Sequence, residues 1–133
     1  MATIPKEYRY SREHEWANYD EAKGIVTVGI TDYAAEKLGE IVFVELPEEN
    51  ATVEREESFG VVESTKSASD LFAPVTGVVV EVNDVLIDTP ELINEDPFDE
   101  GWLVRVKIKD RSELDDLMTA AEYEAFIGEL EEE

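Results

Sequence analysis

Cysteine is absent from this sequence of 133 residues, and histidine occurs only once. Without a thiol, the chain has no disulfide, no thiolate metal ligand and no redox cysteine of its own. Any sulfur chemistry must therefore come from another molecule. The single histidine, His14, also argues against a transition-metal site, because such sites usually combine several histidine and cysteine ligands.

Basic residues are scarce: 11 Lys and Arg stand against 34 Asp and Glu, which gives a formal net charge of -23. Binding to a phosphate backbone depends on Lys and Arg, so we expect no nucleic-acid partner and no anionic membrane partner. Such a charge destabilises a compact chain in dilute salt, whereas at about 1 M salt the Debye length is roughly 3 Å. We therefore hypothesise a salt-adapted source, and the repulsion between copies favours a monomer.

Long apolar runs are missing as well. No segment approaches the roughly 18 residues that suggest a membrane span, and residues 1–7 contain no signal-peptide core. We therefore expect a cytoplasmic protein. Apolar residues still make up 43% of the chain, and the length is that of one ordinary domain, so we expect residues 1–133 to fold as a single unit.

The apolar segments are short and rich in β-branched residues, which predicts a mainly β protein. The expected strands cover residues 25–30, 41–46, 59–64, 71–73, 78–82 and 102–108. Thr31 is a suitable N-cap for a short helix that ends at Gly39. Residues 83–100 are too polar and too interrupted for a long element.

The C-terminal part of the chain changes to a helical pattern. Ser112 with Asp115, and Thr119 with Glu122, each have the spacing of a capping box at a helix start. Behind the second box, apolar residues recur with helical spacing from Tyr123 to Leu130. We expect this last helix to dock on the β core through that apolar face.

Lys66 is the only lysine between Lys37 and Lys107, and the strands expected on either side place it at a hairpin tip. Spacing alone favours a solvated surface lysine. The functional alternative is covalent modification, because an amine forms a stable amide and the neighbouring side chains are small. A catalytic lysine would instead need burial or a second cation beside it, and the sequence suggests neither.

Candidates for an active site are few. His14 lies between Glu13 and Glu15, which could raise its basicity for acid–base chemistry, although a lone histidine in such a setting is more often structural. The sequence contains no calcium-binding loop, no glycine-rich phosphate loop and no serine nucleophile elbow. We therefore expect no active site of its own.

Several stretches together resemble the glycine cleavage system H protein family, in the order in which the family has them. The matching stretches are His14-Glu15-Trp16, Gly29-Ile30-Thr31, residues 38–47, Glu63-Ser64-Thr65-Lys66, residues 74–77, residues 94–97 and Gly101-Trp102. The resemblance covers nearly the whole chain. Thr65 stands where the family usually has valine, and Asn50 stands where a turn glycine is common.

The resemblance implies a barrel-sandwich hybrid of the lipoyl-domain type, made of antiparallel sheets with short helices and a C-terminal helix. It implies that Lys66 carries (R)-lipoate in amide linkage. His14, Glu15 and Asp70 match the positions at which the family shelters its cargo in a cleft. Glu63 and Ser64 match the residues expected to be recognised by the lipoylating enzyme.

By the same resemblance, the chain is a carrier rather than an enzyme. Its implied partners are the PLP-dependent glycine decarboxylase (P protein), the folate-dependent aminomethyltransferase (T protein) and the flavoprotein dihydrolipoamide dehydrogenase (L protein). The enzyme that attaches the lipoyl group is a fourth implied partner. The chain would take the aminomethyl group of glycine from the first to the second, and then present a dithiol to the third.

Other functions of a chain with such a lysine remain possible interpretations of the sequence. A biotinyl domain usually has its lysine between two methionines, whereas Lys66 lies between Thr65 and Ser67, so the local residues argue against biotin. An H-like protein that serves as a lipoyl donor, or an unmodified interaction module, would need the same exposed hairpin. The sequence does not separate these two from the shuttle.

Overall fold

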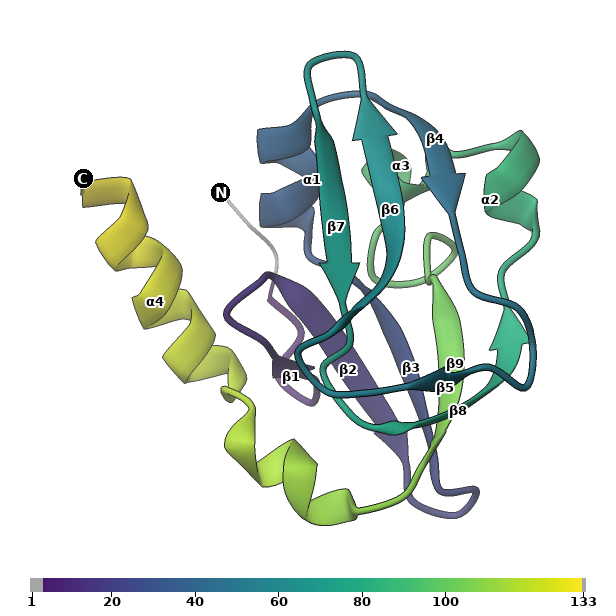
Figure 1. The fold of residues 1–133 in the computed structure, drawn as a ribbon. Helices are drawn as coiled ribbons and strands as arrows, with labels where there is room; N and C mark the ends of the chain where they lie inside the picture. Colours follow the sequence, from purple (N-terminus) through teal and green to yellow (C-terminus); the bar gives the residue numbers. More distant parts are fainter. Residues whose placement is uncertain (1–3, 133) are drawn as a thin grey trace.

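The structure, a computed structural model, describes residues 4–132 and consists of two antiparallel β-sheets with helices at their margins (Figure 1). The larger sheet has the order β1-β2-β3-β9-β8-β5, and the smaller sheet has the order β4-β6-β7. The strands of the larger sheet are β1 (Arg9–Tyr10), β2 (Glu15–Asp20), β3 (Ile25–Ile30), β9 (Val104–Ile108), β8 (Gly77–Val82) and β5 (Thr52–Val53). Those of the smaller sheet are β4 (Ile41–Glu45), β6 (Ser58–Ser64) and β7 (Ala68–Phe72). The expected mainly β architecture is confirmed.

The helices are short except for the last. They are α1 (Asp32–Leu38), α2 (Val85–Asp88), α3 (Leu92–Glu95), the 3-10 helix η1 (Arg111–Asp116) and α4 (Ala120–Glu132). The polar stretch 83–100 thus holds two one-turn helices. No helix within residues 4–132 is long and apolar enough to cross a membrane.

Local sequence chemistry accounts for the ends of α1. The Thr31 side chain accepts a hydrogen bond from the backbone N–H of Ala34, as an N-cap should. The helix stops at Gly39, whose φ of 87° is a conformation that favours glycine. Both ends of this helix therefore follow the sequence prediction.

Several expectations were wrong in detail. The strand expected at residues 102–108 begins only at Val104, and strands β1, β2 and β5 were not expected. Strand β7 covers Ala68–Phe72 rather than residues 71–73, because Ser69 and Asp70 pair with β6 although their side chains are polar. Ser112 does not cap a helix: Asp110 is the N-cap of η1, and its carboxylate accepts hydrogen bonds from the backbone N–H and the hydroxyl of Ser112. The second capping box, between Thr119 and Glu122, is confirmed by its two reciprocal hydrogen bonds.

Two apolar clusters hold the fold together. The larger one contains the inward side chains of the strands, among them Val26, Val62 and Val106. The smaller one joins Tyr10 and Trp16 to Tyr123 and Ile127 of α4, where the rings of Tyr10 and Tyr123 stack with centroids 4.7 Å apart. The last helix therefore docks on the β core through the expected apolar face.

A segment near the start of the described chain pairs with a segment near its end. Tyr10 in β1 forms a bridge with Met118, with hydrogen bonds of 2.9 Å and 2.8 Å between their backbone groups. This bridge leads directly into α4, and Figure 1 shows α4 running along the side of the molecule at which β1 lies. Strand β1 and helix α4 are thus held against each other by this bridge.

Candidate functional site

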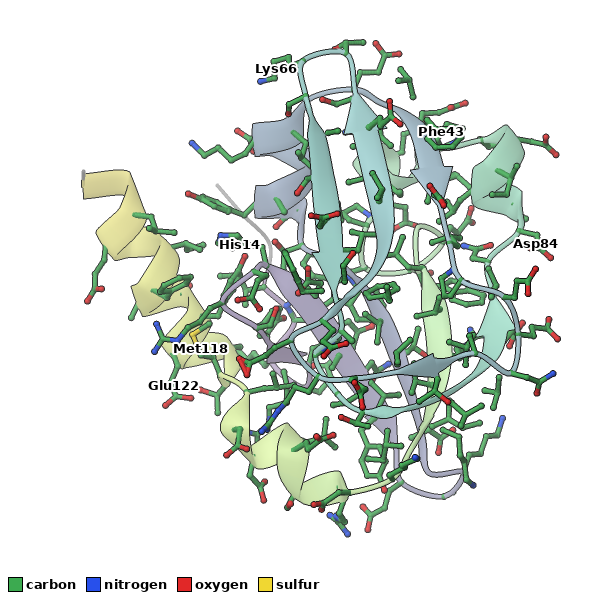
Figure 2. The ribbon with its side chains drawn as sticks, viewed as in Figure 1. His14, Phe43, Lys66, Asp84, Met118 and Glu122 are labelled. Atoms are coloured by element: carbon green, nitrogen blue, oxygen red, sulfur yellow. The ribbon has the colours of Figure 1, made fainter. Side chains whose placement is uncertain are left out.

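Lys66 lies at the tip of the hairpin between β6 and β7, as the sequence predicts (Figure 2). Ser64 shapes this tip: its hydroxyl oxygen accepts hydrogen bonds of 3.1 Å from the backbone N–H groups of Lys66 and Ser67. The Ser64 backbone N–H donates to the carbonyl of Ser67 at 2.7 Å. Ser64 therefore fixes the turn that presents the lysine.

The amine of Lys66 has open surroundings. The residue is exposed, as are its neighbours Thr65, Ser67 and Ala68. Within residues 4–132, the Lys66 side chain forms no hydrogen bond and no ion pair. An amine in this position can be reached by an enzyme from several directions, which fits the attachment of a large acyl group.

The hairpin tip is tied to the turn between α1 and β4. The backbone N–H of Thr65 donates to the carbonyl of Glu40 at 3.0 Å. The stem of Lys66 crosses Gly39 so closely that a Cβ atom at Gly39 would lie 2.9 Å from Cε of the lysine. Glycine at position 39 thus both ends α1 and makes room for the lysine stem.

Asn94 in α3 holds this turn from the other side. Its amide nitrogen donates to the carbonyl of Gly39 at 2.8 Å, and its Oδ1 accepts from the backbone N–H of Ile41 at 2.8 Å. A continuous chain of hydrogen bonds thus runs from α3 through the turn to Thr65. Sequence reasoning did not assign this role to Asn94, although residues 94–97 belong to the stretches that resemble the family.

Glu15 is the buried carboxyl group of the site, with 2% of its surface exposed. Its Oε1 accepts from the Ser11 hydroxyl at 2.7 Å, and its Oε2 accepts from the backbone N–H of Phe72 at 3.1 Å. Burial raises the pKa of Glu15 to about 8, although both hydrogen bonds favour the ionised form. Because Glu15 belongs to β2 and Phe72 to β7, this side chain links the two sheets.

His14 precedes Glu15 but lies in different surroundings. Its φ is 72°, and its Nδ1 is 2.9 Å from the hydroxyl of Tyr123, which is in turn 2.8 Å from the hydroxyl of Thr31. The imidazole also packs against the rings of Tyr33 and Phe126. Burial lowers the pKa of His14. The contacts of His14 therefore join the loop before β2 to α1 and α4.

Asp70 and Glu63 are exposed on the two strands of the hairpin. Asp70 pairs with Val61 and lies two residues before Phe72, on the same face of β7. Glu63 pairs with Ala68 on one side and with Phe43 of β4 on the other. The structure thus places Asp70 along the strand that leads from Lys66 to the Glu15 contact, whereas His14 lies at the α4 side.

A cleft of about 300 Å³ opens beyond the end of β7. Its walls come from the loop before β2, from residues that follow β7 and from the segment before α4, and they include Ser11, Arg12, Ala73, Pro74, Leu117 and Met118. Ser11 is the residue that hydrogen-bonds the buried carboxyl of Glu15. The cleft therefore has mixed apolar and charged walls; Glu15 does not line it and reaches it only through Ser11, and His14 and Asp70 do not line it either.

The family model described as Glycine cleavage H-protein matches residues 8–130. A glycine cleavage system H protein of Anaeromyxobacter sp. (strain K) is 54% identical over 129 residues, which cover 96% of this chain and 98% of that protein. The H protein of Staphylococcus carnosus (strain TM300) is 52% identical over 126 residues, covering 95% and 98%.

A solved structure gives the same result at the level of the fold. The glycine cleavage system H protein of Mycobacterium marinum matches with a TM-score of 0.87 at 44% sequence identity. The match covers 94% of this chain and 99% of the solved one. The agreement in fold therefore extends over nearly the whole chain.

Proposed function

Because the chain belongs to the glycine cleavage H-protein family, we propose that Lys66 is the residue through which it works as the lipoyl carrier of the glycine cleavage system. The observation that carries this proposal is the exposed, unpaired amine at a hairpin tip held by Ser64. A component of a multienzyme system that brings a reactive group to its partners needs no active site of its own.

Attachment of (R)-lipoate to Lys66 requires an activated acyl donor, such as an acyl adenylate or a thioester. The deprotonated Nζ attacks the carbonyl carbon, the C–N bond forms, the bond to the leaving group breaks, and the nitrogen loses a proton. The amide is neutral, so modification removes one of the few positive charges of the chain. When bound, the lipoyl group supplies the disulfide and dithiol chemistry that a chain without cysteine lacks.

The chain's own residues present the attachment point. Ser64 keeps the turn closed, Gly39 leaves space for the lysine stem, and Asn94 holds the turn against which the tip rests. The P, T and L proteins of the system are the partners that a glycine cleavage H protein serves. Holding the reactive group on one small carrier raises its effective concentration at each of these partners in turn.

We further propose that Glu15, Asp70 and His14 shelter the aminomethyl cargo. The buried Glu15 can release its proton when a protonated amine approaches, because a nearby positive charge favours the carboxylate, and the pair is then held by a charge-assisted hydrogen bond. Asp70 is an exposed carboxylate on β7, two residues before Phe72, whose backbone N–H donates to Glu15. His14 holds the loop that precedes Glu15 in place through its contact with Tyr123.

Replacing Glu15 with alanine tests this second part. We expect Glu15→Ala to shorten the lifetime of the cargo on the carrier at least several-fold, because the amine loses its charged partner. The measurement is the rate of spontaneous formaldehyde and ammonia release from loaded carrier. An unchanged lifetime would remove Glu15 from this role and would leave the attachment of lipoate at Lys66 intact as a proposal.

The first experiment is the intact mass of the protein from its native source, followed by mapping of any added mass to a peptide. We expect one lipoyl increment, on Lys66, and none in the variant Lys66→Arg, which keeps the charge but has no acylable primary amine. An unmodified Lys66 in cells that lipoylate other proteins would contradict the carrier function. It would favour an H-like interaction module.

A further inference from the structure

Large apolar side chains are exposed on β4 and on α2, two elements that contact each other. They are Val42 and Phe43, which are 50% and 48% exposed, and Val85 and Ile87, which are 56% and 57% exposed. We call these four residues the β4–α2 patch. Among the described residues, one other large apolar side chain is similarly exposed, that of Val80 in β8. Figure 2 shows Phe43 and Asp84 on the same side of the molecule.

A defect in the strand pairing produces the exposure at β4. The register between β4 and β6 shifts between Ile41 and Phe43, as at a β-bulge. A bulge changes the alternation of faces, so Val42 and Phe43 both point to solvent, whereas Ile41 and Val44 are buried. In α2 the buried residue is Leu86, and its neighbours Val85 and Ile87 are left outside. Grouped apolar side chains on a surface mark an interaction site more often than scattered ones do.

The patch lies directly beside the Lys66 hairpin. In the register of the small sheet, Ile41 pairs with Ser64 and Phe43 pairs with Glu63. An enzyme that acylates the Lys66 amine must surround the amine itself, so it must also cover the strand next to the hairpin. An enzyme that reacts with the far end of the lipoyl group does not need to contact this strand.

Charge around the patch indicates what this enzyme presents. The exposed side chains that border the patch in sequence or in strand register are acidic: Glu40, Glu45, Glu63, Asp84 and Asp88. Between residues 38 and 65 the one basic residue is Arg55, which is engaged by Asp116 at 2.6 Å. A complementary surface therefore has an apolar centre and a rim of Lys and Arg.

We propose that the β4–α2 patch is the docking surface for the enzyme that attaches the lipoyl group to Lys66, and that this enzyme meets it with an apolar centre and a basic rim. The proposal rests on the proposed function, because it takes Lys66 as the attachment site. It adds a recognition surface contributed by β4 and α2, outside the hairpin.

The test is the kinetics of lipoyl attachment to the unmodified full-length chain by the purified lipoate–protein ligase of the source organism, with lipoate and ATP. Phe43→Ser and Ile87→Ser should each raise the KM for the carrier about tenfold and leave kcat within twofold. The matched control is Val80→Ser, an exposed apolar residue of the other sheet, which should change neither value by more than twofold. Thermal unfolding verifies that all three variants keep the fold.

Reversing two of the acidic charges beside the patch gives an independent test. The double variant Asp84→Lys/Asp88→Lys should raise KM, and the dependence of KM on KCl should become weaker than in the wild type, because attraction to the basic rim is lost. A wild-type KM in Phe43→Ser, Ile87→Ser and the double variant would overturn the proposal while leaving Lys66 as the attachment site.

Two further results would also contradict the proposal. If the wild-type chain is not acylated at Lys66 at all, the proposed function and this proposal fail together. If the variants are acylated normally but transfer of the glycine-derived group by the decarboxylase is impaired, the patch belongs to that enzyme. The assignment to the lipoylating enzyme is then wrong.

Discussion

Glu15 illustrates how burial sets the chemistry of a single carboxyl group. Two donors, the Ser11 hydroxyl and the Phe72 backbone N–H, stabilise its ionised form. Desolvation nevertheless outweighs them and raises the pKa from 4.5 to about 8. At neutral pH the resting protein therefore carries a protonated Glu15, and the carboxylate forms when a cation arrives to compensate its charge.

This shift predicts a pH dependence of stability. A folded-state pKa above the unfolded value means that the folded protein binds more protons between about pH 4.5 and 8, so the stabilisation from Glu15 is complete below pH 4.5 and is lost as the pH rises to about 8. We expect wild type to lose stability over this interval relative to Glu15→Gln, by at most about 1.4 kcal/mol per pH unit. Urea unfolding at pH 5, 6.5 and 8 measures the difference. Parallel stability curves would show that Glu15 titrates normally.

Single residues differ in how far their roles could be predicted from the sequence. Lys66 stood out because lysines are scarce in the middle of the chain and its neighbours are small. The roles of Asn94 and Tyr123 could not be inferred in the same way. Their hydrogen bonds to Gly39 and His14 join segments that are far apart in the sequence, and nothing in their local pattern shows this.

Among the elements, the turn between α1 and β4 determines how the Lys66 hairpin is held. On one side the carbonyl of Gly39 accepts a hydrogen bond from Asn94, and the N–H of Ile41 donates one to Asn94. On the other side the turn accepts one from the N–H of Thr65. The turn is therefore a support between α3 and the hairpin tip, and its loss would loosen the tip without altering the residues next to Lys66.

The variant Asn94→Ala tests this support. It leaves the carbonyl of Gly39 and the N–H of Ile41 without these partners, so we expect a loss of about 2 kcal/mol in the free energy of unfolding and faster hydrogen exchange at the Thr65 amide. Asn18→Ala is the matched control, because within residues 4–132 the Asn18 side chain forms no hydrogen bond. Wild-type protection of Thr65 in Asn94→Ala would show that the turn does not support the tip.

The elements with a strong local pattern were predicted well, and the weaker ones were not. Strand β3 has the predicted bounds, because Ile25–Ile30 is β-branched and apolar along most of its length. The start of β7 was missed because the pairing of its backbone with β6 outweighs the polar character of Ser69 and Asp70. At η1, Asp110 competes with Ser112 for the capping position and takes it.

On the scale of the whole molecule, the dominant feature is the net charge of -23. Ion pairs relieve little of it: within residues 4–132 they include those of Arg55, Arg105 and Arg111, and the whole chain has 11 basic residues against 34 acidic ones. Repulsion among the acidic side chains therefore acts against the folded state unless salt screens it. The repulsion is consistent with the hypothesis of a salt-adapted source, which the fold itself does not require.

Salt should accordingly stabilise the protein. We expect the Tm to rise between 10 mM and 1 M KCl, because the Debye length falls from about 30 Å to about 3 Å. Calorimetry at pH 7 measures this rise. Near pH 4.1, where the chain has its isoelectric point, the same addition of KCl should have little effect. Equal values of Tm at both salt concentrations at pH 7 would remove the argument for salt adaptation.

The bridge between Tyr10 and Met118 has a consequence for biosynthesis. A ribosome adds roughly 5–20 residues per second, so Tyr10 leaves the ribosome several seconds before Met118 does. The stacking of Tyr10 on Tyr123 of α4 must wait even longer. The hairpin that bears Lys66 is complete well before that moment. The contacts between β1 and α4 can therefore form only after α4 has been synthesised, which is later than the synthesis of the hairpin residues around Lys66.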